Sequence, residues 1–242
     1  MAPLCLSKRF AAFVESLDQF ESIDALLQGN DPTGKKRADY LLGNRKFIIE
    51  QKVLVSDPVG RPQRFVEKLA AKRGFVFFGT LSSDYIFSRQ PDTNDLKRRM
   101  ALDLARGIDD IVVTADKQTA DTRIVFNIPD AVGILVILNE AAGQLRPDVI
   151  HYALCNTFQK RTPEGAFRYA ANNGVILMSE ANRLVTSLPT QKPVFPILYF
   201  RSPDKKHDAA ATAFSEALIR RWAEFNIAPL VTMPVHVNLR PK

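Results

Sequence analysis

The residues of this chain best suited to chemistry lie on a β-hairpin predicted near its N-terminal end. Residues 38–42 and 46–55 are expected to be strands, because apolar residues dominate them and Gly43-Asn44-Arg45 between them favours a turn. Two-residue periodicity places Glu50 and Lys52 on one face of the second strand. Asp39, on the paired strand, can approach Glu50. The hairpin therefore presents two carboxylates and an ammonium group to one region.

The apolar surroundings of Glu50 and Lys52 predict that opposite charges lie close to them. Apolar residues flank Glu50 and Lys52 on both sides, as in an interior strand. Burying an unpaired ion costs roughly several kcal/mol. Two carboxylates at close range also repel unless a cation lies between them, and Mg²⁺ prefers such oxygen ligands.

The acid-x-lysine spacing alone is not specific, because the chain contains it three times. Asp95/Lys97 falls at the expected start of a helix, and Asp204/Lys206 falls in a loop. Only Glu50/Lys52 combines an upstream acid, a hairpin and two apolar runs. The alternative is a surface Glu–Lys pair on an edge strand, which contributes about 0–1 kcal/mol.

The hairpin resembles the motif of the PD-(D/E)XK, or restriction-endonuclease-like, nuclease superfamily. The resemblance rests on Ala38-Asp39 followed by Ile48-Ile49-Glu50-Gln51-Lys52, and it covers roughly residues 7–140. It implies an αβββαβ core with the motif on a hairpin after an N-terminal helix. Alanine stands where the family has proline, and the family's first strand is not evident between residues 28 and 37.

The resemblance also implies roles for individual residues. Asp39 and Glu50 would bind Mg²⁺ or Mn²⁺, the carbonyl of Gln51 would join them, and Lys52 would position or activate the attacking water. A metal held by two carboxylates supplies what phosphodiester hydrolysis needs. The implied activity is endo- or exonucleolytic cleavage of DNA, or of RNA. The alternative is a nucleic-acid-binding or interaction module on the same fold without catalysis.

Two more residues are candidates for the same site. Many family members carry an acid on the first helix, and Glu21 is the preferred candidate, ahead of Asp24, on a helix expected over residues 7–27. Gln118, on the inner face of a helix expected over 94–118, resembles the family's helix glutamine. The alternatives are a boundary glutamate that reaches water and a core-edge glutamine bonded to backbone.

Basic residues around the motif are candidates for holding a nucleic-acid backbone. The formal net charge of +7 and pI of about 9.5 favour a polyanionic partner without deciding which. A helix expected over 62–72 carries three cations at i, i+4 and i+8. The candidates are Lys35, Lys36, Arg37, Arg45, Lys46, Arg64, Lys68 and Lys72.

Length and composition predict one globular domain over residues 1–242, with a nuclease-like core in 7–140 and an extension of the same domain in 141–242. Two cysteines and three scattered histidines argue against a disulfide framework or a zinc site. Free thiols without a signal peptide favour the cytoplasm, and no apolar run is long enough to cross a membrane. Homodimers are common in the resembled family, so a homodimer is an open expectation by analogy.

The remaining pattern predicts an α/β fold with a mixed central sheet flanked by helices. Further helices are expected over 147–159 and 209–225, and strands over 75–78, 85–87, 132–138, 175–178 and 194–200. Residues 29–36 nearly match a phosphate-binding P-loop. That loop would suit a nucleotide-handling protein, but the final Ser/Thr is missing and a helix precedes it where a strand is required.

Overall fold

The computed structural model describes residues 4–27, 36–76, 82–183 and 194–230, which form a mixed α/β fold. In chain order the elements are α1 (Leu6–Glu15), β1 (Glu21–Ser22), α2 (Ile23–Leu27), β2 (Tyr40–Leu42), β3 (Phe47–Leu54), α3 (Arg61–Arg73), α4 (Ser83–Ser88), α5 (Thr93–Leu104), α6 (Arg106–Val125), β4 (Val132–Asn139), α7 (Pro147–Phe158), β5 (Asn172–Ser179), β6 (Ile197–Arg201) and α8 (Asp208–Phe225).

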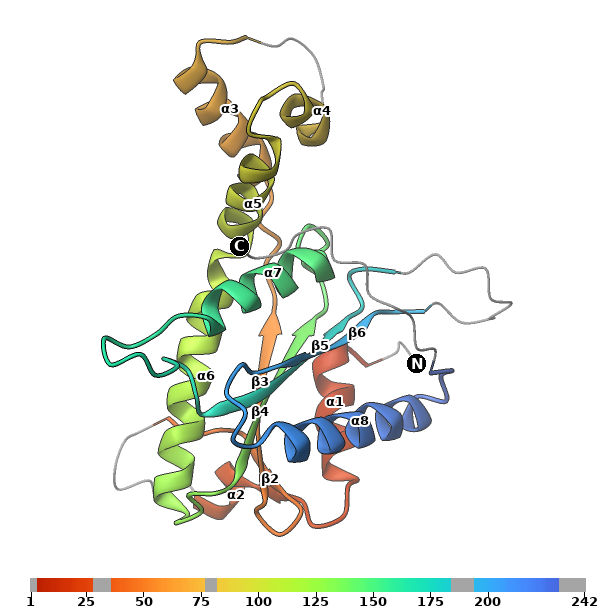
Figure 1. The fold of residues 1–242 in the computed structure, drawn as a ribbon. Helices are drawn as coiled ribbons and strands as arrows, with labels where there is room; N and C mark the ends of the chain where they lie inside the picture. Colours follow the sequence, from red (N-terminus) through yellow and green to blue (C-terminus); the bar gives the residue numbers. More distant parts are fainter. Residues whose placement is uncertain (1–3, 28–35, 77–81, 184–193, 231–242) are drawn as a thin grey trace.

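The strands form one six-stranded sheet in the order β1-β2-β3-β4-β5-β6. β3, β4 and β5 are parallel, whereas β1, β2 and β6 join antiparallel at the two sides. Helices α1 and α8 cover one face of the sheet, and α6 and α7 cover the other (Figure 1). The prediction of a mixed sheet flanked by helices is confirmed.

The hairpin forms as predicted, because its turn and its strands carry strong local signals. Gly43, Asn44 and Arg45 all have positive φ, which glycine and asparagine tolerate best. Strand β4 is buried along its whole length, in keeping with its continuous apolar sequence.

The predicted helix over 7–27 is wrong, because the chain leaves the helix after Glu15. Gln19 has φ of 58°, and the following residues form strand β1 and the short helix α2. Strand β1 then pairs with β2, so a strand lies where the sequence predicted the end of a helix. Phe20 stays on the apolar side through its contact with the Tyr40 ring.

Two other predicted elements differ in the structure. The strand over 85–87 is helix α4, whose N-terminus is capped by the Ser82 hydroxyl accepting from the Tyr85 N–H at 3.2 Å. The helix over 94–118 is two helices, α5 and α6, that meet at Ala105. Of the strand expected over 75–78, residues 75 and 76 belong to no strand, and the rest lies outside the described residues.

Helices α3, α4 and α5 form an arm that extends beyond the carboxyl ends of β3 and β4 (Figure 1). The arm has its own apolar cluster, built on Val66, Leu69, Phe87 and Leu96. Arg61 at its base donates to the carbonyl of Asp103 at 3.0 Å, which ties the start of α3 to the end of α5. None of the described helices has the length and apolar character required to cross a membrane.

Gly133 in β4 has no room for a side chain. A Cβ there would lie 2.3 Å from the Ala171 carbonyl oxygen and 2.6 Å from the methyl group of Thr119. We therefore expect Gly133→Ala to lower the free energy of unfolding by about 1–3 kcal/mol or more, measured by chemical denaturation. Gly107→Ala is the matched control, because nothing lies within 4 Å of a Cβ at that position. An unchanged Gly133→Ala midpoint would contradict the tight packing of Gly133 against Ala171 and Thr119.

Candidate active site

Asp39 is fixed by main-chain hydrogen bonds to strand β3. Its N–H donates to the Ile49 carbonyl at 3.1 Å, and its Oδ2 accepts from the Gln51 N–H at 2.6 Å. The register of β2 on β3 thus sets Asp39 opposite Glu50. The predicted approach of the two acids across the hairpin is what the structure has.

Glu50 and Lys52 lie on the face of β3 that helix α6 covers. The Glu50 side chain is fully buried, whereas 25% of the Lys52 side chain is exposed. The Lys52 ammonium pairs with Glu50 Oε1. Lys52 therefore lies between the buried Glu50 carboxylate and solvent. The Glu50–Lys52 pair is not a surface ion pair.

Gln118 of α6 completes this arrangement. Its Oε1 accepts from the Lys52 ammonium at 2.9 Å, and its Nε2 donates to the Arg37 carbonyl at 2.5 Å. Gln118 thus bonds to backbone, as one of the two alternatives expected, and it also contacts Lys52. The structure brings Asp39, Glu50, Lys52 and Gln118 into one cluster.

Burial makes the two acids hold protons more tightly than usual. Burial, reinforced by repulsion from Asp39, raises the pKa of Glu50 to about 8. Burial also raises the pKa of Asp39, although its hydrogen bond from Gln51 and the charge of Lys52 oppose the shift. The Glu50 Oε2 atom meets no hydrogen-bond donor among the described residues. Such a buried acceptor favours either a proton or a cation beside it.

The donor set fits a hard divalent cation. Asp39 and Glu50 offer carboxylate oxygens, and the Gln51 carbonyl points to the Asp39 side of β3, because N–H and C=O of one strand residue point the same way. The described residues hold no group of three or more His, Cys, Asp or Glu side chains arranged for a metal ion. Two carboxylates are nevertheless the usual protein share of a Mg²⁺ site, whose other ligands are waters and substrate phosphates.

The structure places Glu21 outside this cluster. Its carboxylate accepts a bidentate bond from Arg45, at 2.9 Å from Nε and 2.6 Å from Nη2, and Arg45 lowers the pKa of Glu21. Glu21 occupies strand β1 instead of the predicted helix, which explains the different position. Asp24 lies nearer, because the Ile23 N–H beside it donates to the Asp39 carbonyl and its charge helps to raise the pKa of Asp39.

The predicted phosphate-binding residues fall into separate groups. Arg37 is only 8% exposed, Arg45 is bound to Glu21, and Lys35 lies outside the described residues. Lys46 is exposed at the hairpin turn, four residues or about 13 Å before Glu50. Lys36 is exposed just before β2. Arg64, Lys68 and Lys72 are exposed on α3, in the arm beyond the other end of β3. These residues therefore do not form one continuous track around the motif.

The other two acid-x-lysine pairs lack this environment. Lys97 pairs with the exposed Asp84, and Lys206 pairs with the exposed Asp130. The two acid-x-lysine segments lie at the start of α5 and in a loop, as the sequence predicted. The P-loop-like segment over 29–36 lies outside the described residues apart from Lys36.

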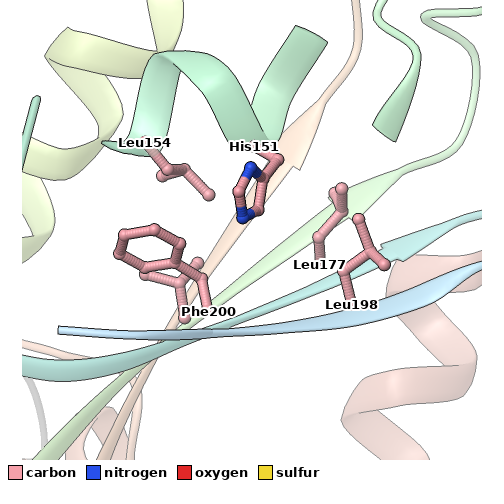
Figure 2. A pocket seen from close by; sticks show the side chains of 6 residues that line it. His151, Leu154, Leu177, Leu198 and Phe200 are labelled. Carbon is pink, nitrogen blue, oxygen red and sulfur yellow. The ribbon is translucent and has the colours of Figure 1, made fainter. Parts of the chain in front are cut away.

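A small apolar cavity lies on the same face of the sheet but away from the acids. Figure 2 shows its lining from α7, β5 and β6, which is His151, Leu154, Val175, Leu177, Leu198 and Phe200. Its volume is about 10 Å³, which is near the minimum for one water molecule. Strand β5 lies two strands, or about 10 Å, from β3. The cavity has neither the size nor the polarity of a substrate site.

Thr122 is a positioning residue that the sequence analysis missed. Its fully buried hydroxyl accepts from the Ala38 N–H at 3.0 Å and donates to the Gln118 carbonyl at 2.8 Å. It thereby fixes the backbone directly before Asp39. The available signal was its spacing of four residues after Gln118, which places both side chains on one face of the helix.

We expect Thr122→Val to destabilise the protein, because the buried Ala38 N–H loses its acceptor. The expected loss in free energy of unfolding is about 1–3 kcal/mol, measured by chemical denaturation. Thr122→Ser keeps the hydroxyl and should recover most of this stability. A Thr122→Val variant as stable as the Ser variant would show that the hydroxyl does not hold this segment.

The chain matches no protein-family model, no curated protein and no solved structure.

Proposed function

We propose that this protein is a metal-dependent nuclease that hydrolyses phosphodiester bonds of DNA, or of RNA, at the cluster of Asp39, Glu50, Lys52 and Gln118. The observation that carries the proposal is the fully buried Glu50 beside a second, partly buried carboxylate and an ammonium group. A structural ion pair between Glu50 and Lys52 does not require Asp39. A site that binds a divalent cation and a phosphate requires a second carboxylate, as Asp39 provides.

The order of elements supports the resemblance to the PD-(D/E)XK superfamily. Along the chain, α1, β1, β2, β3, α6 and β4 follow the order αβββαβ, with the short helix α2 and the arm as additions. The acids lie on the β2–β3 pair, β4 is parallel to β3, and α6 crosses between them. The segment after β4 adds β5, β6, α7 and α8 to the same sheet and its faces.

Each residue of the cluster has a chemical task in this proposal. Asp39, Glu50 and the Gln51 carbonyl would hold Mg²⁺ or Mn²⁺. The bound ion would offset charge on the scissile phosphate and make water more acidic. Lys52, partly exposed and held by Gln118, would orient the attacking water and contribute positive charge at the phosphate. Gln118 is a positioning residue that acts through Lys52.

The test is cleavage of labelled single- and double-stranded DNA and RNA by the purified chain in Mg²⁺, in Mn²⁺ and in EDTA. We expect cleavage in the presence of either metal and none in EDTA. Asp39→Asn should abolish it, because the amide keeps the hydrogen-bond acceptor for Gln51 but removes the charge. Metal-independent cleavage, or full activity of Asp39→Asn, would overturn the proposal.

A further inference from the structure

Positive charge is concentrated in the arm formed by α3, α4 and α5. Between residues 61 and 104 the sequence has nine lysines and arginines against five aspartates and glutamates, a net +4 of the chain's +7. These 44 residues therefore hold more than half of the net charge in less than a fifth of the chain. Residues 55–60 connect β3 to α3, and α5 meets α6 at Ala105, so both ends of the arm continue into elements that carry Lys52 and Gln118.

Helix α3 carries three cations of the arm, spaced along one face, that have no acid partner among the described residues. Arg64, Lys68 and Lys72 are exposed, and none of them forms an ion pair with a described residue. Their four-residue spacing places them on one face, which points away from the apolar residues Val66 and Leu69 that pack in the arm. Two other cations of the arm are paired with acids, in Arg73–Asp92 and Lys97–Asp84, whereas Arg89, Arg98 and Arg99 form no ion pair with a described residue.

The dimensions of this ridge suit a nucleic-acid backbone. At about 1.5 Å per residue, the three cations extend over roughly 12 Å. One strand of a duplex advances about 3.4 Å per phosphate, so the ridge is as long as three or four successive phosphates. No large hydrophobic residue of α3 is exposed, so the ridge lacks the apolar anchors of a membrane-binding helix.

The ridge also lies toward the end of β3 where the candidate site reaches solvent. Lys52 is two residues, or about 7 Å, from the carboxyl end of β3, and the arm begins beyond that end (Figure 1). Arg61 holds the base of α3 against the last carbonyls of α5, at 3.0 and 3.4 Å. The ridge is thus built on a packed arm and is not carried on a loop.

We propose that the arm is a nucleic-acid-docking surface, in which Arg64, Lys68 and Lys72 contact successive phosphates of a strand that leads to the Asp39–Glu50 site. Only the statement that the strand leads to the Asp39–Glu50 site rests on the proposed function. Docking on the arm needs no metal ion, so binding and cleavage can be measured separately.

The experiment measures binding of a fluorescein-labelled 30-base-pair DNA duplex in EDTA over a range of salt concentrations. The variant carries Arg64→Gln, Lys68→Gln and Lys72→Gln together. We expect its affinity to fall by about tenfold or more, and the slope of log affinity against log salt to become shallower by about 2–3.

A matched control removes the same charge elsewhere. Lys8, Arg220 and Arg221 are exposed on α1 and α8, so Lys8→Gln with Arg220→Gln and Arg221→Gln also lowers the net charge by three. The control should keep the wild-type salt slope. Equal losses in both triple variants, or no binding of the duplex by wild-type protein at low salt, would overturn the docking proposal.

Failure of the proposed function gives a different result. If the arm docks a duplex but the site does not hydrolyse it, the arm variant still loses binding in EDTA while no metal supports cleavage. If the site cleaves but the arm does not dock, cleavage persists with an unchanged apparent affinity in the arm variant. Circular dichroism should show the same helix content in the arm variant as in the wild-type protein.

Discussion

Replacing Lys52 with methionine is expected to reduce metal-dependent cleavage by about 10²–10⁴-fold, the range observed when a positioned proton-transfer or charge-stabilising group is lost. Methionine keeps the unbranched apolar stem against β3 and removes only the ammonium group. That group pairs with the buried Glu50 and is held by Gln118 at 2.9 Å, so no neighbouring cation in the cluster replaces it. The measurement is the single-turnover cleavage rate at saturating protein.

The chain offers a control with the same local sequence pattern. Lys206 also follows an acid at the acid-x-lysine spacing, but it pairs with an exposed aspartate on the surface. Lys206→Met should therefore cleave at the wild-type rate. Lys52→Met should still bind duplex in EDTA, which separates lost chemistry from lost docking. A Lys52→Met rate within a few-fold of wild type would remove Lys52 from the mechanism.

The parts of the site that lie close together in sequence were predictable, because local signals specify them. Two-residue periodicity sets Glu50 and Lys52 on one face, and the Gly-Asn turn fixes which residue faces Asp39. Burial of Glu50 follows from its apolar neighbours. Gln118 was also predictable, because the apolar face of its helix must pack on the sheet.

The parts that were wrong depend on where a helix ends. The apolar stripe of α1 continues in phase through Phe20, but the chain turns at Gln19, and Phe20 packs on Tyr40 from outside the helix. The error moved Glu21 from a strand to a helix, and with it the expected position of its carboxylate. Local signals were present but weak: Gly107 lies two residues after the Ala105 break, and the Ser82 hydroxyl caps helix α4.

The arm shows a different limit of sequence reasoning. Periodicity identified α3 and its basic face, but a helix pattern does not say whether the helix packs on the sheet or stands away from it. The separate cluster of Phe87, Leu96 and their neighbours decides that question. Arg37 and Arg45, near the motif in sequence, are buried or paired, whereas Arg64, Lys68 and Lys72 on α3 form no ion pair with a described residue.

Glu50→Gln is expected to remove the loss of stability that Glu50 causes at high pH in the metal-free protein. The folded protein holds the Glu50 proton up to a pKa of about 8, whereas the unfolded chain releases it near the ordinary value of 4.5. The folded-state pKa is therefore raised, so the stabilising contribution of Glu50 is complete below pH 4.5. It is lost progressively as pH rises to about 8, on the order of 1 kcal/mol per pH unit.

Glutamine cannot ionise, so it does not impose this loss. In EDTA at pH 9 we expect Glu50→Gln to be more stable than wild type by a few kcal/mol, or roughly 5–10 °C in Tm. At pH 5 the two proteins should unfold at similar temperatures. Glu216→Gln, an exposed substitution on α8, is the control and should follow the wild-type profile. A Glu50→Gln variant less stable than wild type at pH 9 would contradict the view that ionising the buried Glu50 destabilises the folded protein.

Mg²⁺ should act in the opposite direction and only on the wild-type protein. A ligand that binds the folded state alone stabilises it in proportion to its affinity, and a metal ion binds the deprotonated form of Glu50. We therefore expect Mg²⁺ at about 10 mM to raise the wild-type Tm at pH 8–9 and to have little effect on it at pH 5. The Tm of Glu50→Gln should not change with Mg²⁺ at either pH. An equal rise in Tm in both proteins would show that the ion binds at another place. The amide in the Glu50→Gln variant has no negative charge and cannot replace the Glu50 carboxylate as a ligand.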